Sequence, residues 1–380
     1  MKVALVHDYI KEYGGAERVL EALHELYPDA PVFTSVFLPK FLGPHAERFK
    51  DWDIRTSPLQ QLPFIEKLIS PTRLISANLF RRFDLSGFDV IIVSATGAYF
   101  PNALKKKTAK HICYCHTPPR YLYGYATARE WKKNKVLNVF GELANHFLRM
   151  VDVEVSRNVD YYIANSQEVA GRIKKFYRRD STVIYPPVDL AFRKVASSVQ
   201  LENKKLNAKG YYVAGGRLAR PKHIDLLMKA CQELKVPLKV FGKGFAGHEE
   251  ALHTLAKGKV ELVGEVSDEE KWELLRNAKA YLFASEDEDF GILPVEAMAA
   301  GTPVIAYKSG GVKETVLQSR TGLFFDELTV DSLVKAIKQF EKERFDPKEC
   351  RKQAEKFGKE RFQKEVKAFV EKVLQEKPQK

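Results

Sequence analysis

The 380-residue sequence lacks the features that mark disulfide-stabilised, membrane-spanning and low-complexity proteins. Its four cysteines form no CxxC pair, which favours a reducing, cytoplasmic setting. No apolar run approaches the roughly 20 residues that a membrane-spanning helix needs. The first residues, MKVALVHD, reach an acid too early for a signal peptide. We therefore expect a buried strand at the N-terminus.

Motifs for several common ligands are also missing. No Walker sequence is present, and no aromatic RNA-binding platform is recognisable. These absences argue against P-loop NTPases and RNA-binding domains. No set of His, Asp and Glu has the spacing of metal ligands, so we expect no bound metal.

The length and composition are typical of a globular protein with two domains. The chain is longer than one hydrophobic core usually supports, and its 45% apolar and 29% charged residues are ordinary. The net charge of +13 is uneven, because residues 101–150 carry ten Lys or Arg against two Asp or Glu. This excess fits an acidic partner, such as substrate phosphates, an anionic lipid surface or nucleic acid. It equally fits a solvated, lysine-rich surface.

Short apolar segments alternate with segments of helical spacing over most of the chain. The apolar segments lack strict alternation, which is typical of parallel strands covered on both faces. Helical spacing is clear at Ala16–Leu26 and Ile224–Leu234. We therefore predict two doubly wound α/β domains with parallel sheets. The predicted strands are Val3–His7, Val90–Ser94, His111–His116, Tyr161–Asn165, Thr182–Tyr185, Tyr211–Gly215, Leu238–Phe241, Val260–Val263, Ala280–Ala284, Pro303–Tyr307 and Gly322–Phe325.

A polar, weakly periodic segment separates the two halves. It follows Pro186–Asp189 and is rich in Ser, Asn and Lys, as linkers are. We place the N-terminal domain at residues 1–190, the linker at 191–208 and the C-terminal domain at 209–354. The last segment, Asp346–Lys380, has a helical pattern.

Two glycine-containing turns fall where a parallel sheet binds ligands, beyond the carboxyl ends of strands. Gly14 and Gly15 follow the first strand, and glycines there let backbone N–H groups approach an anion. The second turn, GGRLARPK, carries Arg217 and Lys222, which can each grip one phosphate of a diphosphate. A tight turn and a basic surface loop are the alternatives, but both positions favour anion contacts.

The segment SEDEDFGILPVEAMAAGTPVI carries the most specific pattern. A strand ends in hydroxyl and acid residues, and a helix is expected to begin at Pro294 and to end at Gly301. The backbone amides of Phe290, Gly291 and Ile292 would then point from the helix start towards a negative ligand. The neighbouring carboxylates are suited to accept hydrogen bonds from sugar hydroxyls.

Two of these carboxylates, Glu288 and Glu296, are separated by seven residues. The pair resembles the E-x7-E motif of the family-four retaining glycosyltransferases. The resemblance continues through GGAERVL, ANSQEVAGRI, VIYPPVD, GGRLARPKHIDLL and VELVGEVSDEE in the expected order, and it covers nearly the whole chain. The run HTPPRYLY is similar to the mannosyltransferase-like branch of that family.

The resemblance implies a GT-B fold, in which two Rossmann-like domains face each other across a cleft. It also implies that a C-terminal helix, residues 355–380, packs back on the N-terminal, acceptor-side domain. The C-terminal domain would bind the nucleotide sugar. Catalysis would need neither a metal nor another cofactor, since cations and helix dipoles neutralise the leaving diphosphate.

Site roles follow from the same resemblance. The catalytic residues are expected at His116, Glu288, Arg217 and Lys222. Arg217 and Lys222 match the phosphate-binding pair, Glu296 matches the ribose ligand, and Glu288 matches the acid that contacts the donor sugar. His116 matches a histidine near the anomeric centre, although a strand-end turn would also explain it. The other donor contacts are expected from Gly14, Gly15, Val266, Phe290, Gly291 and Ile292.

We expect a hexose, mannose from GDP-mannose, to be transferred with retention onto a carbohydrate or lipid-linked glycan. A UDP-sugar donor and a catalytically silent sugar-binding relative stay open as alternatives, and no nucleic acid partner is expected. Same-face attack is expected over double displacement with Glu288 as the nucleophile.

Apolar and basic residues together suggest that the N-terminal domain docks on an anionic membrane surface. The segment Leu62–Phe83 combines apolar residues with arginines, as interfacial helices do. Lysines gather at Lys105–Lys107, Lys110, Lys132, Lys133 and Lys135. Ordinary core packing is the alternative for the apolar segment. We expect a cytoplasmic protein, or one peripheral on the inner face of the membrane.

Overall fold

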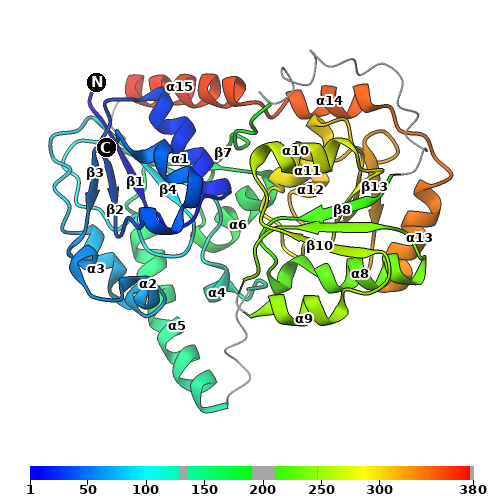
Figure 1. Ribbon diagram of the computed structural model, residues 1–380. Helices are drawn as coiled ribbons and strands as arrows, with labels where there is room; N and C mark the ends of the chain where they lie inside the picture. The colour runs from blue at the N-terminus through cyan, green and yellow to red at the C-terminus, as the bar shows by residue number, and fades with distance from the viewer. Residues whose placement is uncertain (128–134, 191–209, 246, 377–380) are drawn as a thin grey trace. The chain divides into compact units, whose positions relative to one another are not determined.

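The computed structural model describes residues 1–127, 135–190, 210–245 and 247–376 (Figure 1). The predicted linker, residues 191–208, lies outside these ranges. The chain divides into two compact units. The first contains Met1–Tyr125, Trp131–Pro187 and Glu360–Lys380, and the second contains Ala126–Glu130 and Val188–Lys359.

The first unit is built on a parallel sheet of seven strands in the order β3-β2-β1-β4-β5-β6-β7. In the register of this sheet, Leu5 lies between Val32 and Ile92. The strand order reverses between β1 and β4, which creates a topological switch point at their carboxyl ends. The strands are β1 (Val3–His7), β2 (Val32–Thr34), β3 (Ile54–Thr56), β4 (Val90–Ala95), β5 (Lys110–Cys115), β6 (Tyr161–Ala164) and β7 (Thr182–Val183).

Helices cover both faces of this sheet. Successive strand residues point to opposite faces, so Leu5 packs with α1 and α15, whereas Val6 packs with α3, α5 and α6. The helices of this unit are α1 (Gly15–Leu26), α2 (Ile65–Leu68), α3 (Ser76–Phe80), α4 (Arg120–Tyr123), α5 (Lys135–Ser156), α6 (Gln167–Tyr177) and α15 (Lys359–Gln375). Short 3-10 helices are η1 (Pro39–Phe41), η2 (Gly43–Phe49), η3 (Pro58–Gln61) and η4 (Pro71–Ile75).

The predicted C-terminal helical segment is two helices, α14 (Pro347–Glu355) and α15, separated at Phe357 and Gly358. Apolar residues of α15 recur at helical spacing and are fully buried. They join the core that α1 forms with the first sheet, and their spacing places them along one side of the helix. These residues are Phe362, Val366, Val370 and Val373.

The second unit has a parallel sheet of six strands in the order β10-β9-β8-β11-β12-β13. This is the order of a doubly wound nucleotide-binding domain, with its switch point between β8 and β11. The strands are β8 (Tyr212–Gly215), β9 (Leu238–Phe241), β10 (Val260–Gly264), β11 (Tyr281–Phe283), β12 (Val304–Tyr307) and β13 (Gly322–Phe325).

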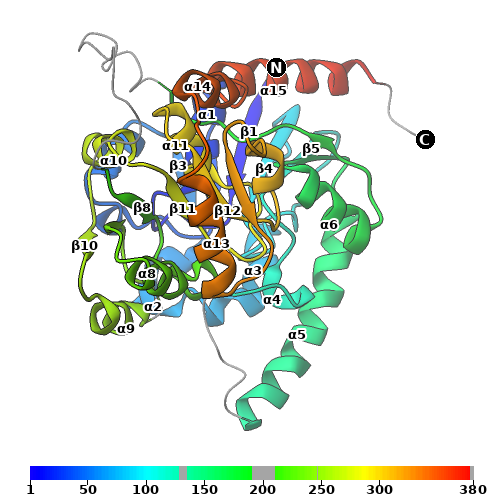
Figure 2. The same ribbon diagram turned by 90° about the vertical axis from the view of Figure 1, so that its right-hand side faces the viewer.

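Helices also cover both faces of the second sheet. α8 and α13 pack into one core with alternate residues of the strands, and α10, α11 and α14 lie on the other face (Figures 1 and 2). The helices are η6 (Arg220–Lys222), α8 (Ile224–Glu233), α9 (His248–Leu255), α10 (Asp268–Arg276), α11 (Ile292–Ala299), α12 (Val312–Thr315), α13 (Val330–Phe340) and α14.

The structure confirms the prediction of two doubly wound domains with parallel sheets. It also corrects two local predictions. The sequence patterns missed β2 and β3, each of which has only three residues. The helix expected to begin at Pro294 begins at Ile292, and Pro294 is its third residue. The missing N–H of proline still costs little there, because the first four amides of a helix have no partner within it.

Candidate active site

The carboxyl ends of β8 and β11 meet at the switch point of the second unit. Tyr281 of β11 lies beside Val213 of β8, and its hydroxyl donates to the carbonyl oxygen of Gly215 at 3.0 Å. The loops beyond the two strands are also joined, since the Glu286 N–H donates to the Pro221 carbonyl oxygen at 2.8 Å. The fold thus brings the GGRLARPK and EDEDFG segments together.

Lys222 and Glu288 form an ion pair across these two loops. The Lys222 Nζ lies 2.5 Å from the Glu288 Oε2, and the Ser285 hydroxyl donates to the same oxygen at 2.5 Å. The ammonium group of Lys222 also lies 5.3 Å from the centre of the Phe283 ring. The predicted phosphate-binding cation and the predicted sugar-binding carboxylate are therefore in direct contact.

Arg217 lies in the same glycine-rich segment but contacts a different neighbour. Its guanidinium lies 5.0 Å from the centre of the Phe245 ring, in the range of a cation–π contact. Phe245 belongs to the loop after β9, and its N–H donates to the Leu218 carbonyl oxygen at 3.3 Å. The sequence did not single out Phe245, because an isolated aromatic residue in a loop carries no pattern.

Glu296 is the fifth residue of α11 and is almost fully buried. Its Oε1 lies 3.0 Å from the Nζ of Lys271, which also lies 2.9 Å from the Oδ1 of Asp268. A buried carboxylate requires such a partner, because losing water without compensation would cost several kcal/mol. Lys271 and Asp268 are on α10, and sequence analysis missed both.

Two glycines after β12 hold the loop that carries Glu288. The Gly311 N–H donates to the Glu288 carbonyl oxygen at 2.9 Å. Gly310 has a φ of +69°, and a Cβ added there would lie 2.1 Å from the same carbonyl oxygen. Only glycine permits both this backbone conformation and this close approach, so the glycines fix the position of the acidic loop.

The remaining predicted donor contacts lie at the edges of this arrangement. Gly291 is the N-cap of α11 with a φ of +89°, and Ile292 begins the helix. The Phe290 side chain is buried against the Phe357 ring, with 5.5 Å between ring centres, so only its backbone remains to contact a ligand. Val266 is half-buried, directly before Ser267, the N-cap of α10.

The predicted residues of the first unit belong to a second network. The Ser94 hydroxyl lies 2.9 Å from the His116 Nε2 and 3.1 Å from the His7 Nδ1. The other nitrogen of His7 lies 3.6 Å from Glu17, whose carboxylate accepts from the Gly14 N–H at 2.8 Å. His116 and Gly14 are thus connected at the carboxyl ends of β1, β4 and β5, and Gly15 begins α1.

His116 is held as a neutral imidazole. Burial and, to a smaller extent, the nearby His7 together lower its pKa to about 3. At neutral pH the His116 ring can therefore donate or accept a hydrogen bond, but it does not supply positive charge. The sequence placed His116 correctly at a strand end and gave no indication of Ser94 and His7.

In the part of the chain that the structure describes, no three His, Cys, Asp or Glu side chains gather as a metal site would require. Asp287, one of the two aspartates that flank Glu288, accepts a hydrogen bond from the Ala126 N–H at 3.0 Å. Within the same described ranges, no helix combines the length and the apolar character needed to cross a membrane.

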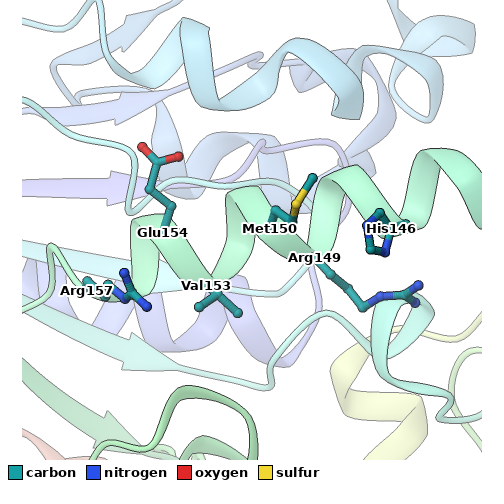
Figure 3. Close-up of a pocket in the computed structure, with 6 residues that line it drawn as sticks. All are labelled: His146, Arg149, Met150, Val153, Glu154 and Arg157. Carbon is teal, nitrogen blue, oxygen red and sulfur yellow. The ribbon is translucent and has the colours of Figure 1, made fainter.

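A hollow of about 410 Å³ lies along α5 in the first unit, and none of the predicted site residues lines it. Figure 3 shows that its labelled lining residues come from this one helix and from Arg157, which directly follows it. They are His146, Arg149, Met150, Val153, Glu154 and Arg157. The hollow lacks the convergence of groups from several elements that ligand pockets show, so we assign the chemistry to the strand ends.

Comparisons with known families and proteins match both units. A model of group 1 glycosyl transferases matches residues 200–360, and a model of glycosyltransferase family 4 matches residues 13–192. The alpha-1,3/1,6-mannosyltransferase ALG2 of Dictyostelium discoideum is 25% identical over 288 residues, which are 66% of each chain. ALG2 of Schizosaccharomyces pombe is 24% identical over 371 residues, which are 85% of this chain and 70% of the relative.

The matches with ALG2 of Dictyostelium discoideum, Rhizomucor pusillus and Mus musculus span 66%, 65% and 66% of the relatives' own length, slightly less than two thirds. Among solved structures, Anabaena HepE in complex with UDP has a TM-score of 0.69 at 19% identity and covers 98% of this chain and 100% of its own. Sucrose-phosphate synthase from Thermosynechococcus elongatus has a TM-score of 0.70 at 18% identity, with coverage of 98% and 99%. Likeness at such low identity shows the fold alone.

Gly310→Ala should destabilise the protein by roughly 2–4 kcal/mol, because the added Cβ would strain a positive φ and collide with the Glu288 carbonyl oxygen. Gly258→Ala is the matched control. Gly258 has a φ of +66° with nothing within 4 Å of its Cβ position, so the change should cost about 1 kcal/mol. Urea denaturation measures both. Equal losses of stability in the two variants would show that the loop carrying Glu288 can shift to accommodate the added Cβ.

Proposed function

The chain belongs to glycosyltransferase family 4 and has the GT-B fold, and from this membership we propose that it transfers mannose from GDP-mannose with retention. The acceptor in this proposal is a carbohydrate or lipid-linked glycan. The choice of sugar rests on the ALG2 mannosyltransferases among the relatives. The observation that carries the chemistry is the pairing of Lys222 with Glu288 at the switch point of the second unit.

The chemistry follows from what a nucleotide diphosphate sugar presents to this site. Its diphosphate carries negative charge that grows as the bond to the sugar breaks. Lys222 and Arg217, in the glycine-rich segment, supply the compensating charge. Because Lys222 is then drawn to phosphate, the Glu288 carboxylate becomes available to accept hydrogen bonds from the sugar hydroxyls. The ion pair thus holds both groups in place before the donor binds.

Retention in this proposal comes from attack on the face of the sugar that the diphosphate leaves. The bond between the anomeric carbon and the phosphate oxygen breaks, and the acceptor oxygen bonds to the same carbon. The acceptor proton passes to a leaving-phosphate oxygen. In this scheme Glu288 keeps its hydrogen bond from the Ser285 hydroxyl and accepts from the sugar hydroxyls, and it does not act as the nucleophile. His116, being neutral, contributes a hydrogen bond to the sugar in this scheme.

No metal is required in the proposed reaction, since Arg217 and Lys222 provide the charge that a divalent cation would otherwise supply. The nucleotide sugar is the only co-substrate. A UDP-sugar donor is the second candidate, motivated by the UDP and UDP-glucose complexes of Anabaena HepE. A catalytically silent sugar-binding protein is the third, and it would bind a nucleotide sugar without breaking it.

We also propose that the first unit docks on an anionic membrane surface, although by a smaller surface than the sequence suggested. Within Leu62–Phe83, Ile65, Leu79 and Phe80 belong to the core, which contradicts an interfacial role for them. Phe64 and Leu74 are 70% and 60% exposed. Leu62, Leu68 and Ile75 are exposed as well.

The exposed apolar residues lie at the carboxyl edge of the first sheet. Arg73 donates to the Ala98 carbonyl oxygen at 2.8 Å, and residue 98 follows β4. α2 and the first half of α5 lie at this same end of the unit in both views (Figures 1 and 2). Val139 and Leu143 add exposed apolar side chains on α5.

The lysine cluster that the sequence suggested lies elsewhere. Lys105–Lys107 precede β5, and Lys106 pairs with Asp160, which precedes β6. The cluster is therefore at the amino edge of the sheet, opposite the apolar patch. Lys132 and Lys133 lie outside the described residues. The membrane-binding surface that we propose consists of the apolar patch and the neighbouring Lys67 and Arg73. It does not include the lysine cluster before β5.

The purified protein should hydrolyse GDP-mannose slowly without an acceptor, and faster than UDP-glucose or UDP-GlcNAc, in a buffer containing EDTA. Hydrolysis is the informative reaction because it needs no knowledge of the acceptor. Release of free sugar, measured for each donor, tests the proposal. Hydrolysis of only a UDP-sugar would favour the second candidate, a UDP-sugar-dependent enzyme. Binding without any hydrolysis would favour the silent relative, and loss of activity in EDTA would contradict metal independence.

Arg217→Ala should lower kcat/KM by a factor of about 10²–10³, on the order of 3 kcal/mol, because a partner of the developing phosphate charge is lost. Arg320→Ala is the matched control, since Arg320 is an exposed arginine of the same unit that pairs with Glu349. Steady-state donor hydrolysis measures both variants. Near-normal turnover in the Arg217 variant would contradict the phosphate assignment.

Phe64→Glu combined with Leu74→Glu should abolish binding to vesicles that contain anionic lipid, because charged groups replace the exposed apolar anchors. The unmodified protein should sediment with anionic but not neutral vesicles, and less as the salt concentration rises. Leu374→Glu on α15, also exposed, is the control and should bind normally. Equal sedimentation of the double variant and the unmodified protein would remove this patch from the account.

A further inference from the structure

The carboxylate of Glu296 is more deeply buried than that of Glu288, at 5% against 16% exposed. We propose that Lys271 is a positioning residue, which orients Glu296 towards the ribose hydroxyls of the donor. This inference rests on the proposed nucleotide-sugar donor and deepens it. Nothing in the sequence pattern indicated Lys271, which is the fourth residue of α10.

The geometry distinguishes Lys271 from a surface lysine. Its Nζ lies between two carboxylates, 3.0 Å from Glu296 Oε1 and 2.9 Å from Asp268 Oδ1. The Lys271 side chain is 12% exposed and that of Glu296 is 5% exposed. In this enclosed position a single arrangement of the three groups is favoured, since each charge needs the others.

The ion pair leaves Glu296 able to bind a ligand. A carboxylate can accept about four hydrogen bonds through its two oxygens, so Glu296 can keep Lys271 while it accepts from two neighbouring hydroxyls. The lysine that pairs with Glu288 is held less firmly. Lys222 is more exposed than Lys271, at 27%, and the diphosphate competes with Glu288 for it. Lys271 has a second anchor in Asp268 and stays in place when the donor binds.

α10 also connects the ribose contact to the base. Val266, the predicted nucleobase contact, comes directly before the N-cap Ser267. The Ser267 hydroxyl accepts from the Glu270 N–H at 3.1 Å, and the Glu270 carboxylate accepts from the Ser267 N–H at 2.8 Å. This reciprocal cap fixes the loop relative to the first turn of the helix. The cap holds the nucleobase loop without Lys271, so replacing this lysine should disturb the ribose contact and leave the base contact in place.

The experiment compares the affinity of ribonucleotides with that of analogues that lack the ribose hydroxyls. Dissociation constants for GDP and UDP, and for the 2′,3′-dideoxy form of each, are measured by titration calorimetry. The proteins are the unmodified chain, Lys271→Met, Lys271→Arg, Asp268→Asn and Glu296→Gln. Lys229→Met is the matched control, because Lys229 pairs with Asp225 at 3.1 Å on the exposed side of α8.

The unmodified protein should prefer the ribonucleotide about 10- to 100-fold, the value of one or two hydrogen bonds to a charged acceptor. Lys271→Met should remove most of this preference and leave the affinity for the dideoxy form within about twofold. Lys271→Arg should retain most of it, and Asp268→Asn should give an intermediate loss. Lys229→Met should behave as the unmodified protein. If Lys271→Met does not fold, Lys271→Arg and Asp268→Asn decide.

Three results would overturn the inference. Full preference in Lys271→Met, together with its loss in Glu296→Gln, would show that Glu296 works without Lys271. An equal loss of affinity for both nucleotide forms would show a merely structural role. No preference in the unmodified protein would remove the ribose contact itself, and the proposed donor site would then fail together with the inference.

Discussion

The ion pair between Lys222 and Glu288 is the interaction on which the account of the second unit depends. It joins a loop after β8 to a loop after β11, and these two strands flank the switch point of a doubly wound sheet. The two groups are opposite in charge, and in the proposed reaction they contact different parts of a nucleotide sugar. Their pairing satisfies both charges before a donor is present, so that neither has to be held unpaired in a partly buried site.

Backbone constraints place this pair. A side chain at Gly310 would collide with the Glu288 carbonyl oxygen, and one at Gly311 would collide with the Asp289 carbonyl oxygen. Glu296 and Lys271 form a second ion pair, between α11 and α10. The first unit has its own arrangement, in which Ser94 connects two histidines at the ends of three strands. In each unit the polar groups lie where parallel strands end, because the helices that cover both faces leave the carboxyl edge as the open side.

Much of this was predictable from the sequence, and the reasons are physical. Long apolar strands and glycine-bounded helices have a clear periodicity, so the two sheets and the segments around Arg217 and Glu288 were placed correctly. β2 and β3 were missed because neither short strand lies within a longer apolar run, whereas the equally short β11 lies within the apolar run Ala280–Ala284. Lys271 was missed because ion pairs between helices distant in sequence leave no local pattern. Some apolar residues of Leu62–Phe83 are in the core and others are exposed. The sequence did not predict which, because apolar composition does not indicate which face of a short helix is covered.

The most direct test of the central claim is a crystal structure of the protein with GDP-mannose, or with GDP and mannose if the donor is cleaved. The account predicts diphosphate oxygens within hydrogen-bond distance of Arg217 and Lys222, with the Lys222–Glu288 pair opened and the ribose hydroxyls on Glu296. A nucleotide bound away from the carboxyl ends of β8 and β11, with Lys222 still on Glu288, would contradict it.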